Sequence, residues 1–177
     1  MNRLITLIAL SIIASGLFSI ASAQERRALT VDDIVKWNRI TERKISDDGK
    51  YISVIKEPWK GTAEAMLFDR KGSSLFTADS VKGTFFTPDG EFYIVHRAGK
   101  KVESLIIFNT KSGTKERVDS VSKFRLMDEW GPWILWSRKD STLISSNLTS
   151  GNRINHGKVK EWVAADKRPA ILTLSGD

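Results

Sequence analysis

The 177-residue sequence contains no cysteine. Disulfide bonds, cysteine nucleophiles, thiolate metal sites and iron–sulfur clusters are therefore excluded, because each of them needs a thiol. A lipid anchor on a cysteine behind an N-terminal leader is excluded for the same reason. Any fold that this chain adopts must be stabilised by a packed core.

The sequence also has few of the residues that catalysis uses. It has only two histidines, His96 and His156, and neither has a second histidine or a carboxylate cluster at metal-ligand spacing. A general base or a metal ligand needs partners within reach, so we predict structural or surface roles for both. The sequence lacks a G-x-S-x-G nucleophile elbow. We therefore assign no catalytic residue, no metal site and no cofactor to this chain.

The first 23 residues differ in composition from the rest of the chain. Arg3 gives a positive start, residues 4–13 are almost wholly apolar, and Ala21 and Ala23 are the small residues that signal peptidases recognise. A membrane anchor is the alternative, but the apolar run is short for a span of about 20 residues. We predict cleavage between Ala23 and Gln24, export to the periplasm or the medium, and no stable membrane anchor afterwards.

The charged residues are scattered along the chain. Lysine and arginine number 28 against 21 acidic residues, which gives a net charge of +7. A basic excess can attract nucleic acid or an anionic surface. Here no run of basic residues exceeds two, which favours an ordinary solvated surface, and we expect no nucleic-acid partner.

A repeat of about 41 residues runs through the rest of the chain. Its clearest sign is a polar turn whose glycines, Gly49, Gly90 and Gly131, are 41 and 41 residues apart. A second series of turn glycines has spacings of 41 and 38 residues: Gly72, Gly113 and Gly151. Two interleaved series with the same spacing indicate a structural repeat.

Each repeat has the pattern of four short strands joined by turns. An Asp-Gly pair between apolar runs is typical of a tight hairpin, because glycine accepts a positive φ and Asp bonds to its own backbone. The runs are rich in β-branched and aromatic residues, which suit a buried sheet. The strands that we predict in the second and third repeats cover residues 83–87, 91–97, 102–109, 114–119, 133–137, 141–147 and 152–156. Four strands in about 40 residues are typical of a propeller blade.

The predicted fold class is therefore all-β, a partial β-propeller of about three and a half four-stranded blades preceded by a short N-terminal helix. Thr30 stands three residues before Asp33, which favours a helix start, and we expect the helix to cover residues 31–38. The predicted domains are a signal peptide (1–23), an N-terminal segment with the helix (24–41) and an incomplete propeller (42–177). Its blades cover about 42–82, 83–121, 122–159 and, in part, 160–177.

Three aspartates have a functional alternative. Asp47, Asp48 and Asp89 are carboxylates of the kind that acid–base catalysis pairs. They stand in the repeating turns, however, where an aspartate caps its own turn. We predict that capping role.

Three tryptophans also have two interpretations. Trp130, Trp133 and Trp136 form either an aromatic platform for a peptide or a sugar, or part of the packing within a blade. Trp133 is followed by Ile134 and Leu135 in an apolar run, which favours packing.

Two segments near the start of the repeats carry a family resemblance. They are Ala28-Leu29-Thr30-Val31-Asp32-Asp33-Ile34-Val35-Lys36-Trp37 and Ile45-Ser46-Asp47-Asp48-Gly49-Lys50-Tyr51-Ile52. Together they resemble the start of bacterial exported peptidases of the prolyl oligopeptidase family, which includes relatives of dipeptidyl peptidase IV. Those enzymes open with a leucine-threonine-x-acidic helix that ends in Trp, followed by an I-S-x-D-G-K blade.

The resemblance implies a propeller of seven or eight blades that caps a C-terminal α/β-hydrolase domain with a Ser-Asp-His triad. It also implies that the propeller gates access for a peptide substrate and helps to hold the substrate's N-terminal side. The sequence stops at Asp177, part-way into the fourth blade. We therefore expect an N-terminal fragment whose partners are the missing C-terminal blades and the hydrolase domain, and whose exposed strand edges favour aggregation.

A second hypothesis is a non-catalytic periplasmic propeller that binds partners through its blade loops, as in Tol-type systems. Such proteins share the S-x-D-G-K turn, so the blades alone do not separate the two hypotheses. The helix between Thr30 and Trp37 favours the peptidase.

Overall fold

The computed structural model describes residues 28–100 and 102–175. The predicted cleavage residues Ala21, Ala23 and Gln24 lie outside these ranges. The chain divides into two compact units, residues 1–34 and 35–177, and every strand described here belongs to the second. Within the described ranges, the structure has no helix that is both long and apolar enough to cross a membrane.

The N-terminal helix is shorter than predicted. Helix α2 covers only Val31–Val35, and none of its residues is buried. Its start is as expected, because Thr30 Oγ1 donates a hydrogen bond to Asp33 Oδ2 at 2.8 Å. The helix ends early because strand β1 (Asn38–Ile45) begins at Asn38, opposite Pro58 of strand β2. This first strand therefore starts inside the segment 24–41 that we had placed before the propeller.

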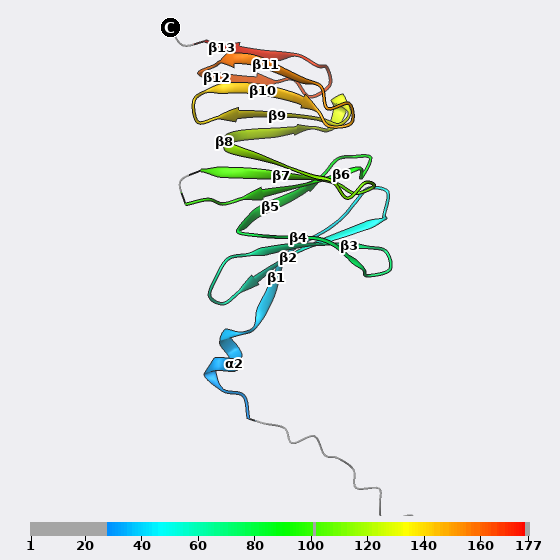
Figure 1. Cartoon of the computed structure of the whole chain (residues 1–177), viewed down its shortest axis with the longest axis vertical. Coiled ribbons are helices and arrows are strands. Elements are labelled where there is room, and N and C mark those ends of the chain that lie inside the picture. The colour runs from blue at the N-terminus through cyan, green and yellow to red at the C-terminus, as the bar shows by residue number, and fades with distance from the viewer. Residues whose placement is uncertain (1–27, 101, 176–177) are drawn as a thin grey trace, which may run out of the picture. The chain divides into compact units, whose positions relative to one another are not determined.

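Within the described residues, thirteen antiparallel strands follow one another (Figure 1). Beyond β1 the strands are β2 (Tyr51–Pro58), β3 (Glu64–Asp69), β4 (Ser74–Asp79), β5 (Val81–Phe86), β6 (Phe92–Arg97), β7 (Glu103–Asn109), β8 (Lys115–Met127), β9 (Trp133–Arg138), β10 (Thr142–Asn147), β11 (Arg153–Lys158), β12 (Glu161–Ala164) and β13 (Ile171–Leu174). The first sheet has the order β1-β2-β3-β4, the second has β11-β10-β9-β8-β7-β6-β5, and β12 pairs with β13. The predicted all-β fold class is confirmed.

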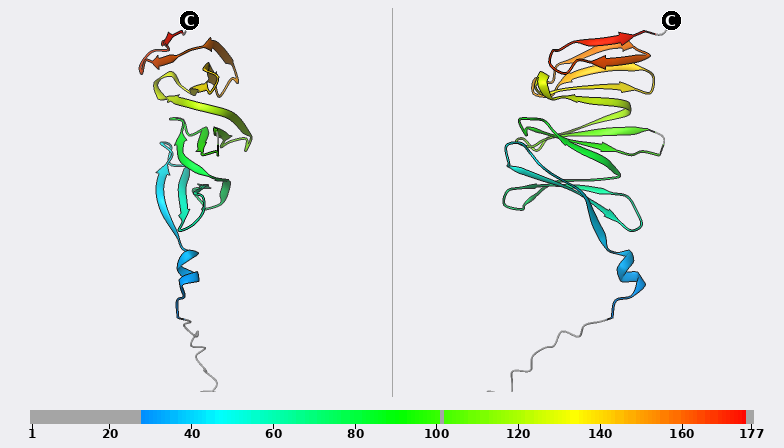
Figure 2. Two further views of the ribbon diagram at one scale, coloured as in Figure 1. Left: turned by 90° about the vertical axis from the view of Figure 1, so that its left-hand side faces the viewer. Right: turned by 180° about the vertical axis from the view of Figure 1, so that it is seen from behind.

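Strand β8 belongs to two repeats. Its residues 115–121 pair with β7, and its residues 121–127 pair with β9. Ser120 lies at the junction with a φ of 61°, just as Ser80 lies between β4 and β5 with a φ of 56°. The seven-stranded sheet thus consists of two four-stranded blades, blade 2 and blade 3, that share β8. Strands β1–β4 form blade 1 (Figure 2).

The turn between the first two strands of a blade has the predicted chemistry in blades 1 and 2. Asp48 Oδ1 accepts hydrogen bonds from the Ser46 hydroxyl at 2.7 Å and from Lys50 N–H at 3.1 Å. Asp89 repeats this arrangement in blade 2. Gly49 and Gly90 have φ values of 67° and 68°, which only glycine adopts at no steric cost. The capping role predicted for these two aspartates is confirmed.

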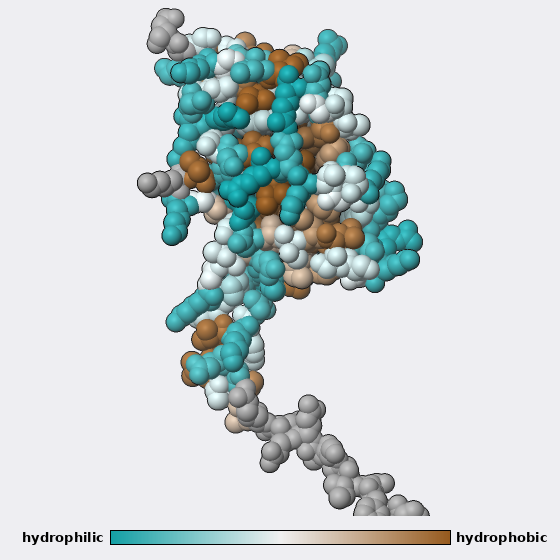
Figure 3. Space-filling view, in the orientation of Figure 1, coloured by the Kyte–Doolittle hydropathy of each residue, from teal (hydrophilic) through white to brown (hydrophobic). Residues whose placement is uncertain are grey.

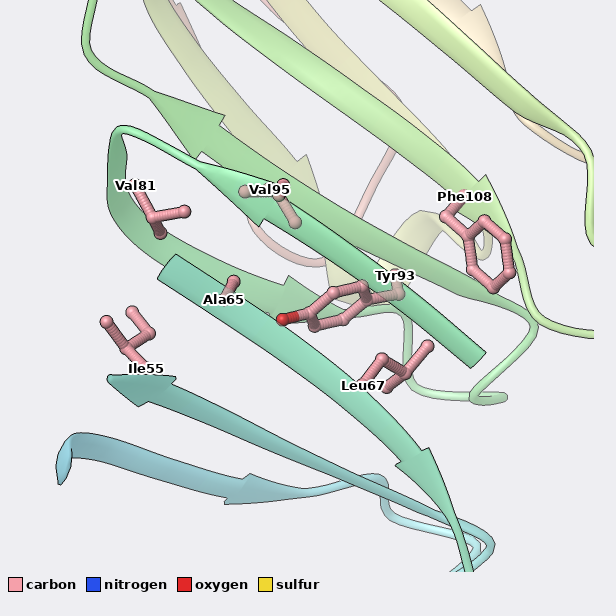
Figure 4. Packing of buried hydrophobic residues seen from close by; sticks show 8 residues of the cluster. Ile55, Ala65, Leu67, Val81, Tyr93, Val95 and Phe108 are labelled. Carbon is pink, nitrogen blue, oxygen red and sulfur yellow. The ribbon is translucent and has the colours of Figure 1, made fainter. Parts of the chain in front are cut away.

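The hydrophobic core lies between successive sheets. Blade 1 contributes Ile55, Ala65 and Leu67 to the first cluster, and blade 2 contributes Tyr93, Val95 and Phe108; Figure 4 shows these side chains facing one another across the two sheets. The second cluster joins blades 2 and 3 through Phe92, Ile94, Leu105, Ile107, Ile134 and Trp136, and the third joins blade 3 to the last hairpin through Met127, Leu135, Leu143, Trp162 and Ala164. Each blade therefore depends on its neighbours for burial.

Candidate functional site

A pocket of about 690 Å³ lies along the ends of the first strands of three blades. We call it the first-strand pocket. Its lining residues come from β1 and its turn, from β5, and from β8 with the 3-10 helix (Asp128–Trp130) that follows it: Lys44, Ile45, Asp47, Phe85, Phe86, Phe124, Arg125, Leu126 and Asp128. Figure 3 shows apolar residues among hydrophilic ones on one face of the part of the molecule that contains the strands.

The middle of the pocket is aromatic and carries a cation. The rings of Phe85 and Phe124 meet edge to face, with their centroids 5.4 Å apart. The Lys44 ammonium lies 4.8 Å from the centroid of Phe85 and 3.2 Å from Glu42 Oε1, and it also donates to the Thr84 carbonyl oxygen. Lys44 is thus held against the aromatic surface by three contacts.

A buried polar network lies beneath Lys44 and fixes β1 against β5. Thr84 Oγ1 donates to Glu42 Oε1 at 2.6 Å. The Ser53 hydroxyl lies 3.4 Å from Thr84 Oγ1 and 2.6 Å from the Tyr93 hydroxyl. Burial raises the pKa of Tyr93 to about 12, so the phenol stays neutral and serves as a hydrogen-bonding group.

Two aspartates stand at the acidic end of the pocket. Asp47 and Asp128 both line it. Burial, followed by the charges of Asp47 and Glu129, raises the pKa of Asp128, while Arg125 opposes that rise. Arg125 itself donates to the Ala164 carbonyl oxygen at 3.0 Å and pairs with Asp166. The prediction for Asp47 is therefore corrected: its side chain lies at the pocket, while its neighbour Asp48 provides the turn cap.

The pocket combines several kinds of binding group. It offers aromatic rings, two cations and two carboxylates, without a serine or histidine among its lining residues. Within residues 28–100 and 102–175, no three histidine, aspartate or glutamate side chains lie close enough together to hold a metal ion. The arrangement suits an elongated ligand that has both charged and apolar groups.

Both histidines have structural partners. His96 Nε2 lies 2.6 Å from Glu103 Oε2, and that carboxylate also pairs with Lys82, which is the first cause of its lowered pKa. His156 Nε2 lies 2.8 Å from the Ser145 hydroxyl. This Ser–His pair resembles part of a catalytic triad, but Ser145 is 2% exposed. A substrate does not reach its oxygen, and the pair joins β10 to β11.

Trp130, Trp133 and Trp136 take part in core packing. Trp136 is 1% exposed and belongs to the cluster between blades 2 and 3. Trp130 and Trp133 pack against the cluster between blade 3 and β12–β13. The indole N–H groups of Trp130 and Trp136 are buried without a hydrogen-bond partner, which is the cost of using such large rings as core residues. They form no aromatic platform.

Sequence reasoning did not find most of the pocket. Lys44, Phe85 and Arg125 are about 40 residues apart in the sequence, and only the stacking of blades brings them together. One signal was available in the repeat itself. Asp47 and Asp128 both stand shortly before a turn glycine of the first series, Asp47 before Gly49 and Asp128 before Gly131.

Comparisons with known proteins show the fold. Neither a protein-family model nor a curated protein sequence matches the chain. Among solved structures, the β-propeller domain of the Trilobed protease from Pyrococcus furiosus has a TM-score of 0.53 and 12% identity, over 73% of this chain and 46% of that one. A prolyl endopeptidase structure has a TM-score of 0.49 with 14% identity over 77% of this chain and 25% of that one, and the RRP9 WD40 repeats have 0.46 with 13% identity over 78% and 52%.

One of these matches has a TM-score above 0.5, and it shows the fold class. The chain has a β-propeller fold of the type found in the Trilobed protease. It spans about a quarter to a half of the length of the structures that it matches. At 12% identity the likeness to the Trilobed protease propeller shows the fold alone, and activity requires a separate argument.

Proposed function

We propose that this chain is the N-terminal propeller portion of an exported serine peptidase of the prolyl oligopeptidase type. In this proposal the blades gate and position peptides for a downstream α/β-hydrolase domain. The hydrolase domain supplies the Ser-Asp-His triad and acyl transfer at the peptide bond. The residues described here bind and orient the substrate.

The observation that supports this proposal most strongly is local. Of the two segments that resemble the peptidase family, residues 28–37 contain the short helix α2, and residues 45–52 form the end of strand β1, the Asp48 turn and the start of β2. The likeness in fold to a protease propeller agrees with this assignment.

The first-strand pocket suits a peptide. A peptide combines charged ends with apolar side chains, and the pocket combines Lys44 and Arg125 with Phe85, Phe124 and two aspartates. Apolar contacts with a few placed polar groups are the usual composition of a binding site for a small ligand.

Sequencing the genomic locus beyond the codon for Asp177 tests the assignment to a peptidase. We expect an in-frame continuation through further blades to a G-x-S-x-G motif and a later histidine. A stop codon at that point contradicts the peptidase. It favours the second candidate, a non-catalytic propeller of the Tol type, because the first-strand pocket offers binding groups for a partner.

A binding measurement tests the pocket. Calorimetric titration of the full chain with short peptides that carry a free amino terminus and an aromatic side chain should detect binding. Phe124→Ala should weaken this binding at least several-fold. Lys111→Ala, in a hairpin outside the pocket, should leave it unchanged. Equal affinities for the two variants contradict a peptide role for this pocket.

A further inference from the structure

A charged groove runs along the last strand of blade 2, where blade 3 lies beside it. Two pockets, of about 480 and 330 Å³, share Glu116 and Arg153 among their lining residues, so they adjoin. We call the two together the β8 groove. The wall from blade 2 includes residues 114–120, and the opposite wall comes from β9, β10, β11 and the turns between them. The β8 groove and the first-strand pocket are lined by different residues.

Strand β8 has an open backbone edge along this groove. Its residues 115–121 pair with β7 on one side, and β9 pairs only with residues 121–127. In an antiparallel ladder every second residue turns its N–H and C=O away from the neighbouring strand. Among the described residues, no second strand bonds to these outward groups along 115–119. An extended peptide can take that place, because strand addition uses the same main-chain groups.

The charge of the β8 groove is positive on balance. Five cations and three carboxylates line it: Lys115, Arg117, Arg138, Lys139 and Arg153, against Glu116, Asp119 and Asp140. Two of the carboxylates are already neutralised, because Arg117 Nε lies 2.7 Å from Asp119 Oδ1 and Arg153 pairs with Glu116. A ligand with carboxylates of its own complements the remaining charge.

Two cations at different places in the groove carry unpaired charge. Lys115 lines the smaller pocket and Arg138 lines the larger one, and in the described part of the chain neither has an ion-pair partner. Arg153 lines both pockets, and its guanidinium lies 5.7 Å from the centroid of the Trp136 ring. The seven residues 114–120 span roughly 20 Å when extended. Carboxylates several residues apart on an extended peptide can therefore reach Lys115 and Arg138.

We propose that the β8 groove binds an acidic segment of a partner protein in extended conformation, as a strand added to the open edge of β8. The backbone hydrogen bonds provide affinity, and the cations select carboxylate side chains. Every residue of this site belongs to blades 2 and 3. The site is separate from the first-strand pocket and goes beyond the peptide-positioning role proposed for it.

Fluorescence anisotropy of the full chain with a labelled peptide tests the chemistry of the partner. The probe has both ends blocked and alternates glutamate with valine over about eight residues, which is enough to span the groove. The control peptide has glutamine in place of glutamate. We expect the acidic probe to bind several-fold more tightly than the control, and added salt to weaken its binding. Equal affinities for the two peptides overturn the proposal, as does equally tight binding of single-stranded DNA with the same charge.

A substitution in the groove tests the site. Arg138→Gln should weaken binding of the acidic probe several-fold, because it removes a cation that has no ion-pair partner within the described residues. Arg70→Gln removes the same charge from the exposed β3–β4 turn of blade 1 and should leave the affinity unchanged. Equal affinities for the two variants overturn the assignment to the β8 groove.

Amide hydrogen exchange tests the strand addition. Saturating acidic probe should slow exchange at alternate residues of 115–119, where the outward N–H groups become hydrogen-bonded. Strand β4 is the matched control, because it is also the last strand of its blade and stands at the edge of its sheet. Its residues 74–79 should exchange at an unchanged rate. Equal slowing in both strands, or in neither, overturns the proposal, and none of these results bears on the genomic test for a peptidase.

Discussion

The contact between blades 1 and 2 and the contact between blades 2 and 3 use the same strands of the repeat with different chemistry. In the first contact Ser53 meets Tyr93 through hydroxyl groups 2.6 Å apart. At the matching positions, 41 residues later, the second contact has Ile94 and Ile134, which are both fully buried. One contact therefore has a pair of hydroxyl groups at its centre, and the other has two isoleucine side chains at the same positions.

This difference gives the two contacts different roles: one mainly stabilises the fold, and the other mainly fixes how two blades are placed against each other. Apolar burial stabilises roughly in proportion to area and has no directional preference. Hydrogen bonds inside a core are satisfied only in one arrangement. The polar network lies where β1 meets β5, next to Lys44, and so it sets the geometry of the first-strand pocket. We infer that the contact between blades 2 and 3 supplies most of the stability. The polar contact between blades 1 and 2 fixes the position of these two blades relative to each other.

The largest effect is expected for a substitution in the apolar contact between blades 2 and 3. Trp136→Ala should lower the free energy of unfolding by about 3–5 kcal/mol, because it leaves a large cavity between two sheets. Urea denaturation at low protein concentration measures the change. Trp59→Ala, at a ring that is 75% exposed, should cost less than about 0.5 kcal/mol. A similar loss for both variants contradicts the assignment of Trp136 to the core.

A smaller effect is expected at the polar contact. Tyr93→Phe should cost about 1–2 kcal/mol, because it leaves the Ser53 hydroxyl without that partner in the core. Adding Ser53→Ala should cost little more, since both changes remove the same bond. Full additivity in this double-mutant cycle shows that the two hydroxyls do not stabilise each other.

The turn of blade 1 should show a pH dependence. Hydrogen bonds from the Lys50 side chain, the Ser46 hydroxyl and the Lys50 N–H lower the pKa of Asp48 from 3.8 to about 2. A lowered pKa stabilises the fold above about pH 4, and this contribution is lost as the pH falls toward 2. Asp48→Asn should therefore cost about 1 kcal/mol at pH 7 and nothing near pH 2.

The same substitution in blade 2 is the matched control for Asp48→Asn. Asp89 has the same turn bonds, but Glu91 stands where blade 1 has Lys50. Asp89→Asn should cost less at pH 7 than Asp48→Asn in urea denaturation. Equal costs contradict a role for the Lys50 ion pair.

The smallest effect is expected at Asp128. Burial and the charge of Asp47 raise its pKa, so the native state holds this proton more tightly than the unfolded chain does. Stability then falls as the pH rises through the titration of this carboxyl. Asp128→Asn should stabilise the protein by up to about 0.5 kcal/mol at pH 7 and not at pH 3. A loss of stability at pH 7 indicates that the carboxylate has a favourable partner.

The parts of the structure that were predicted correctly depend on local chemistry. A glycine with positive φ between two strands leaves a sequence signal, and Gly49 and Gly90 both adopt that conformation. The junctions at Ser80 and Ser120 were missed because serine is not typical of positive φ. Each lies in an Asp-Ser-Val tripeptide, 40 residues apart, so the repeat did contain the signal.

The features that were not predicted correctly depend on contacts between residues that are far apart in the sequence. Trp37 extends the apolar pattern of the helix, yet the chain leaves the helix after Val35, since pairing with β2 starts at Asn38. Tertiary pairing outweighs a short helical pattern. The first-strand pocket was not predicted for the same reason, because its lining residues come from three blades.

The shared strand β8 has a consequence for how the protein opens. Its backbone amides at 115–121 and 121–127 are bonded to neighbours in two different blades, so local melting of either blade frees the end of a strand on which the other depends. Blades 2 and 3 should therefore lose amide-exchange protection in one cooperative event. Blade 1 has its own hydrogen-bonded sheet and can exchange separately, so the first-strand pocket can lose its β1 wall while the walls from β5 and β8 stay folded.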